Sequence, residues 1–123
     1  MISLTPQRIA AIYDCLRQFH PFTRWGLPES DAVEFRVAAR KDVQGEFART
    51  KWDRLNGHRI TVSYINNHHY DSVVRTIAHE MIHQAQEIAG TSTKPQYQHY
   101  HNEDFKKRAH KVCKAFGFDE GQF

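Results

Sequence analysis

The sequence predicts a single α+β domain spanning residues 1–123. Helical spacing of apolar residues near both ends and in the second half predicts three helices, and alternation of apolar and polar residues between them predicts one small sheet. A chain of 123 residues is long enough for one compact domain, and its 40% hydrophobic and 25% charged residues are ordinary for a globular protein.

The first predicted helix begins at Thr5 and Pro6. Threonine is a common N-cap, and proline fits the first helical position. Apolar residues then recur at helical intervals, at Ile9, Ile12, Leu16 and Phe19. The stretch HPFTRWGLPES, which contains two prolines and a glycine, is expected to end this helix.

Three strands are expected next. Val33, Phe35, Val37 and Ala39 alternate with polar neighbours in AVEFRVAAR, EFART follows the turn KDVQG, and HRITVSYI follows the turn LNG. Consecutive strands with short connections usually pair with each other. We therefore expect a three-stranded antiparallel meander. Because EFART is short and rich in polar residues, we separately expect it to be an exposed edge.

Two helices complete the domain. The central helix is expected to begin with Asp71 or Ser72 as its N-cap and to end at Gly90. Its apolar residues cover a wide arc, which is typical of a buried helix. The last helix is expected between Asn102 as the N-cap and Gly117.

The central helix contains an HExxH motif in TIAHEMIHQAQ. His79 and His83 are one turn apart on one helix face, about 6 Å along the axis, and can bind one metal ion. Glu80 can reach a water on that ion without binding the ion itself. The alternative, histidines that only fill the core, requires three buried polar groups to find other partners. We expect Zn²⁺ at this motif, with Glu80 as the general base.

A catalytic zinc site commonly has a third protein ligand. The compact spacing HExxHxxGxxH is absent, because positions 86 and 89 are Gln and Ala. The third ligand must therefore follow Gly90, and the candidates are His99, His101, Glu103 and His110. His101 is favoured because the next residue, Asn102, is the expected helix cap.

The chain resembles the SprT-like metallopeptidase family, which includes the Spartan proteases. The resemblance lies in TIAHEMIHQAQ, in HNEDF and in GHRITVSYIN ahead of the motif. It implies a minimal zincin-like fold and a zinc-dependent endopeptidase, with a zinc-bound water as nucleophile and DNA-associated proteins among its substrates. By this resemblance His79, His83 and His101 are the metal ligands and Glu80 is the base. Asn102 stands where the family commonly has glycine.

Two further features of a peptidase site are expected near the motif. A second donor to the developing oxyanion would assist hydrolysis, and Tyr97, His99 and Tyr100 are candidates in the loop after the central helix. A peptide substrate is expected to add as a strand along EFART.

Charge and cysteine usage bear on partners and location. The net charge is +3, and residues 36–59 contain seven basic and three acidic residues, so DNA contact through this region is a hypothesis. The corresponding alternative function is a non-catalytic zinc-containing nucleic-acid-binding domain.

Cys15 and Cys113 are expected to be buried free thiols. Because no signal peptide or membrane span is visible, we expect a cytoplasmic protein.

Overall fold

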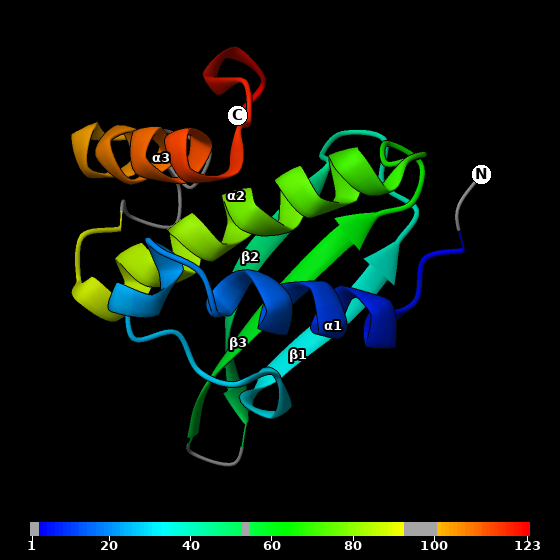
Figure 1. Ribbon diagram of the computed structural model, residues 1–123. Helices are drawn as coiled ribbons and strands as arrows, with labels where there is room; N and C mark the ends of the chain where they lie inside the picture. Colours follow the sequence, from blue (N-terminus) through cyan, green and yellow to red (C-terminus); the bar gives the residue numbers. More distant parts are fainter. Residues whose placement is uncertain (1–2, 53–54, 93–100) are drawn as a thin grey trace.

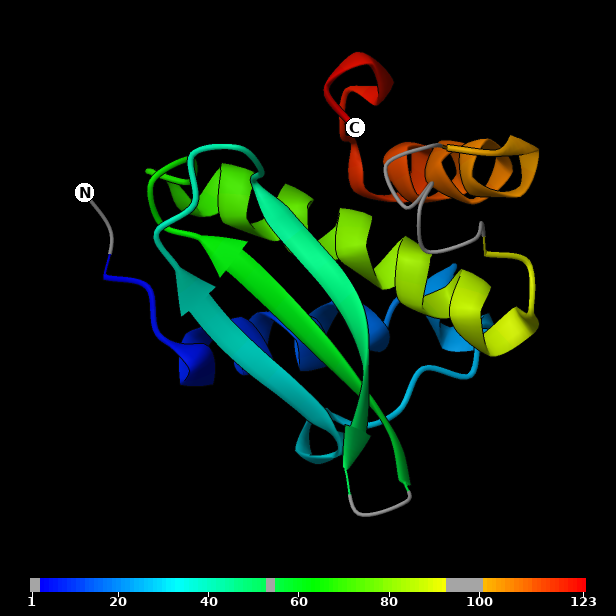
Figure 2. The same ribbon diagram turned by 180° about the vertical axis from the view of Figure 1, so that it is seen from behind.

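The computed structural model describes residues 3–52, 55–92 and 101–123. Within these residues the elements follow the order α1 (Pro6–Arg17), β1 (Val33–Ala38), β2 (Gly45–Trp52), β3 (Leu55–Ser63), α2 (Tyr70–Ala89) and α3 (Glu103–Phe116), with short 3-10 turns between some of them. Figure 1 shows α1 and α2 lying across one face of the sheet, with α3 beside α2. Figure 2 shows the opposite face of the sheet, which no described helix covers. The expected α+β class is confirmed.

The helix boundaries follow the local signals in the sequence. The Thr5 hydroxyl accepts a hydrogen bond from the Arg8 amide, and the Asn102 side chain accepts one from the Phe105 amide. Gly90 and Gly117 end α2 and α3 with positive φ angles of 75° and 78°, which glycine adopts without steric cost.

The predicted N-cap of α2 is wrong by two or three residues. The helix begins at Tyr70, with His69 at the N-cap position and no side-chain capping bond. Ser72 does not cap the helix, because its hydroxyl donates to the carbonyl of His69 at 3.0 Å.

The sheet is mixed, so the predicted antiparallel sheet is wrong. The strand order is β1-β3-β2, with β1 parallel and β2 antiparallel to β3. The predicted LNG turn is also wrong, since Leu55–Gly57 already belong to β3. EFART lies within β2, which is an edge strand as expected.

The connection between β1 and β2 explains this strand order. Residues 39–44 cross the end of β3 instead of forming a tight hairpin. Asn66 donates to the carbonyls of Arg40 and Val43 at 3.0 and 2.8 Å, and Asn67 donates to that of Gln44 at 3.0 Å. These bonds satisfy carbonyls that a crossing segment would otherwise leave unpaired. β3, whose Ile60 and Val62 are fully buried, therefore occupies the centre of the sheet.

The core lies between the sheet and the helices. The buried face of α1 consists of Ile9, Tyr13 and Leu16, which pack with α2 and β3 in one hydrophobic cluster. Cys113 is buried as expected, but Cys15 is exposed because it lies outside this face of α1, so that prediction is wrong. The helices in the described part of the chain lack the length and hydrophobicity needed to cross a lipid bilayer.

Candidate metal centre

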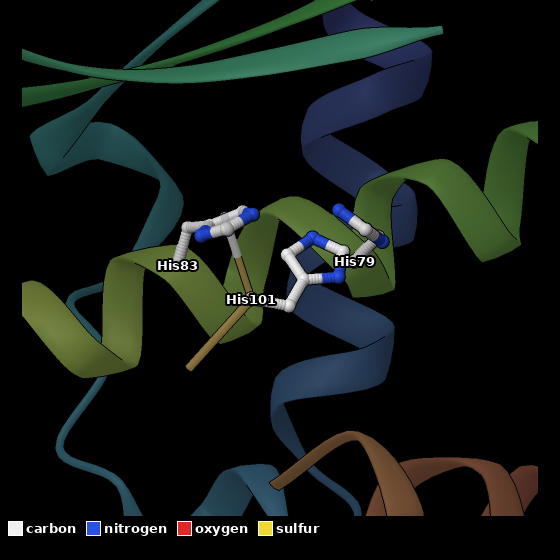
Figure 3. Close-up of side chains that lie close together, drawn as sticks. All are labelled: His79, His83 and His101. Carbon is white, nitrogen blue, oxygen red and sulfur yellow. The ribbon is translucent and has the colours of Figure 1, made fainter. Parts of the chain in front are cut away.

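Three imidazoles lie together beside the middle of α2. His79 and His83 project from the same side of that helix, and His101 reaches them from the residues just before α3 (Figure 3). Their candidate ligand nitrogens all lie within 4.8 Å of one another. The structure thus brings together two histidines of the HExxH motif and a third from 18 residues beyond it.

The other candidates for the third ligand lie elsewhere or outside the described residues. The His110 ring pairs with Glu120, and Glu103 pairs with Lys106 at 3.6 Å on the exposed surface of α3. His99, together with Tyr97 and Tyr100, the other two candidate oxyanion donors, lies outside the described residues.

Phe105 holds the third imidazole in place by ring stacking. Its ring centroid lies 3.7 Å from that of His101, with 16° between the ring planes. The same ring lies 4.7 Å from His83 and 5.1 Å from His79, and Phe105 is only 2% exposed. Sequence reasoning missed this role of Phe105, which lies in the first turn of α3, four residues after His101.

A hydrogen-bonded clasp joins the end of α2 to the start of α3. We use the name Gln86 clasp for the contacts among Gln86, Asn102 and Asp104. The buried Gln86 amide donates to Asn102 Oδ1 at 2.9 Å and to Asp104 Oδ2 at 3.1 Å. Asn102 also donates to the Thr91 carbonyl at 2.9 Å. Because His101 directly precedes Asn102, the clasp fixes where the third imidazole enters the centre.

Glu80 is buried next to this centre. Its side chain is 5% exposed, and the backbone N–H of Phe47 in β2 donates to its carboxylate. Burial, followed by the nearby negative charge of Glu46, raises the pKa of Glu80 to about 8, although the Phe47 hydrogen bond opposes the shift. The carboxylate is therefore a group that can take up and release a proton near neutral pH.

Gly45 allows β2 to approach Glu80. A Cβ at this position would lie 2.6 Å from Thr76 Cγ2, 3.0 Å from the Thr61 carbonyl oxygen and 3.3 Å from Glu80 Oε2. The Thr76 hydroxyl donates to Asn67 Oδ1 at 2.9 Å, which holds this part of α2 against the end of the sheet. The sequence predicts only a turn at Gly45, since nothing local to it indicates this close approach.

The donor set is compatible with zinc. Three imidazole nitrogens and an open position are typical of catalytic zinc sites, where neighbouring ligands lie about 3.4 Å apart. Side-chain rotation can close the remaining gap from the 4.8 Å limit. Burial and then the charge of His101 lower the pKa of His79 to about 4, despite a hydrogen bond with the main chain of Phe123. At neutral pH His79 is thus in the neutral form that binds metals.

A cleft of about 210 Å³ opens beside His79 and Glu80. Its walls come from the start of β2, from α2 and from the last residues of the chain: residues 43–45, Arg75, Thr76, His79, Glu80, Gln122 and Phe123. The Phe123 ring lies 5.4 Å from the His79 ring, between centroids. The Glu80 carboxylate and one imidazole therefore face a solvent-connected space next to an edge strand.

Comparison with known proteins gives one match. The model of the SprT-like family matches residues 12–121, nearly the whole chain. Neither the curated proteins nor the solved structures gave a significant match.

Proposed function

The chain belongs to the SprT-like family, and we propose that it is a zinc-dependent endopeptidase with Glu80 as its general base. One observation carries the proposal: three imidazoles from two separate segments gather beside a buried carboxylate at the wall of a cleft. A buried structural zinc site would need a fourth ligand and would have no use for this carboxylate. The arrangement also supports a zincin-like organisation of the helix and the edge strand.

His79, His83 and His101 would hold the zinc ion through neutral imidazole nitrogens. Bound zinc would lower the pKa of a coordinated water and of the nearby carboxylate, and would polarise the peptide carbonyl. Glu80 then accepts a proton from the attacking water and delivers it to the leaving amine. The Phe47 N–H orients the Glu80 carboxylate for both transfers.

The free edge of β2 is the proposed place for the peptide. β3 pairs with one side of β2, and no described strand pairs with the other. An extended peptide can add to such an edge through main-chain hydrogen bonds. Gly45 and Phe47, which belong to this strand, both lie at Glu80, so an added peptide would pass the catalytic carboxylate.

DNA-associated proteins as substrates, and DNA contact through residues 36–59, remain proposals that rest on the family and on charge. Most arginines of this region have carboxylate partners: Arg36 and Arg59 pair with Glu34, Arg40 with Asp42 and Glu46, and Arg49 with Glu87. These pairs reduce the positive charge that is available to a phosphate backbone. The proposal therefore needs a direct test with DNA.

The test compares the wild-type protein with Glu80→Gln and His101→Ala. We expect near-stoichiometric zinc and casein cleavage in the wild type, zinc without cleavage in Glu80→Gln, and loss of both in His101→Ala. Assays with and without single-stranded DNA test activation. Zinc binding without cleavage under either condition, with salt-sensitive DNA binding, would instead support the non-catalytic nucleic-acid-binding alternative.

A further inference from the structure

Among the described residues that line the cleft, Arg75 is the only arginine or lysine. It lies on α2 four residues before His79, about 6 Å away along the helix axis. Glu80 also lines this space, but it is the proposed base and is held by the Phe47 amide. The Arg75 guanidinium is therefore the permanent positive charge among the described side chains that line the cleft.

The hydrogen-bonding capacity of Arg75 is largely unused. Its Nε is buried and has no hydrogen-bond partner among the described residues. Its Nη1 lies 3.5 Å from the side-chain oxygen of Gln122, which is the outer limit for a hydrogen bond. By contrast, Arg40, Arg59 and Arg108 each pair with a carboxylate at 2.8 Å or less. A guanidinium frequently binds a carboxylate through two of its donors, and no ion pair joins Arg75 to a carboxylate of the described residues.

We propose that Arg75 binds a carboxylate of the substrate peptide and so gives the enzyme a preference for an acidic group close to the scissile bond. This inference rests on the proposed peptidase function and names its substrate class. The Gln122 amide oxygen marks the position of the carboxylate, since an amide is close to it in shape but carries no charge. Arg75 and His79 are one helical turn apart along α2, and an extended peptide advances about 3.3 Å per residue. The bound carboxylate would therefore lie about two substrate residues from the scissile bond.

Two kinds of peptide can supply this carboxylate. One is an internal Asp or Glu side chain within two residues of the cleaved bond, on the side where β2 begins at Gly45. The other is the free carboxyl end of a peptide cut close to its terminus. Both kinds of peptide present the same carboxylate to Arg75. Amidation of the peptide end abolishes the preference only if the free carboxyl end is the group that Arg75 binds.

The first arm of the test measures kcat/KM on quenched fluorescent peptides that differ only by Glu or Gln near the cleaved bond, each with a free or an amidated end. We expect the wild type to prefer the acidic peptide about tenfold, because a charge-assisted pair contributes at least that much. Arg75→Gln should reduce the ratio to about one while cleaving the Gln peptide normally. Arg24→Gln, at an exposed position of the 3-10 turn Phe22–Arg24, is the matched control and should keep the ratio.

A second variant avoids any effect on the folding of α2. Gln122→Glu changes an exposed residue and places a carboxylate of the chain itself beside Arg75. We expect it to weaken the preference for acidic peptides without changing the melting temperature. Cleavage of both peptides at equal rates by the wild type would overturn the inference and leave the proposed function standing.

The second arm measures binding and does not need turnover. Fluorescence anisotropy of the same labelled peptides is measured with Glu80→Gln and with Glu80→Gln combined with Arg75→Gln. We expect about tenfold tighter binding of the acidic peptide in the first protein and equal binding in the second. If the wild type cleaves nothing but this difference in binding persists, the proposed function fails and the Arg75 site stands. Equal binding of the two peptides by Glu80→Gln would overturn it.

Discussion

Replacement of Gln86 by alanine tests whether the Gln86 clasp positions the third imidazole. The change removes hydrogen bonds of 2.9 Å to Asn102 and 3.1 Å to Asp104. Neither acceptor is left unpaired, because the Phe105 amide still reaches Asn102 and the Arg108 side chain still reaches Asp104. The cost is therefore the net value of two hydrogen bonds and a small cavity, about 2–3 kcal/mol in the free energy of unfolding.

The same change should weaken metal binding. His101 directly precedes Asn102, so loosening the clasp lets this imidazole move relative to His79 and His83. We expect the zinc dissociation constant to rise about tenfold, as is typical when a residue that supports a ligand is lost. Competition with a fluorescent chelator measures that constant, and urea unfolding of the zinc-free protein measures stability.

A control separates the two effects of this substitution. Ile9→Val shortens a fully buried side chain of α1 and should cost about 1 kcal/mol of stability. It should leave the zinc dissociation constant unchanged. If Gln86→Ala loses stability while its zinc affinity stays that of the wild type, the clasp does not position His101 and the reasoning is refuted.

Three other predictions follow from the site. Gly45→Ala puts a Cβ 2.6 Å from Thr76 Cγ2 and 3.3 Å from Glu80 Oε2. We expect a lower melting temperature because the site is overpacked, and a lower kcat because Glu80 is displaced. An unchanged kcat would show that β2 moves without disturbing Glu80. Burial raises the pKa of Asp104, but hydrogen bonds from Arg108, Thr91 and Gln86 outweigh it and leave that pKa below its ordinary 3.8. The stabilisation by ionised Asp104 is thus present above about pH 4 and is lost as the pH falls further. Urea unfolding should therefore show that the difference in free energy of unfolding between wild type and Asp104→Asn narrows below that pH. A difference that stays constant would contradict this. EDTA should abolish peptide cleavage and added zinc should restore it, whereas cleavage that survives the chelator would exclude a metal-dependent reaction.

Most helix boundaries could be predicted from sequence because they depend on neighbouring residues. The start of α2 is the exception, since His69 at its N-cap makes no side-chain capping bond. The Thr5 and Asn102 caps each act on an amide three residues away, and Gly90 and Gly117 act through their own φ angles. The order of the strands depends on distant residues. Asn66 reaches the carbonyl of Arg40 from 26 residues away, and no local pattern announces that contact.

The same distinction applies to the candidate site. The spacing of His79 and His83 follows from helix geometry alone. The approach of His101 depends on the Gln86 clasp, which spans 16 residues. In the sequence, the only signal that favours His101 is the cap residue that follows it. The sequence predicts no more than a turn at Gly45, because the side chains that exclude a Cβ there lie on α2.

The position of Phe105 restricts how this protein can be engineered. Its ring belongs to the hydrophobic cluster and also lies flat against His101. A redesign that repacks the interior for heat resistance would normally exchange one large apolar side chain for another. At Phe105 such an exchange would also alter a wall of the histidine cluster, whereas Val112, buried on the same helix, can be varied in size with regard to packing alone.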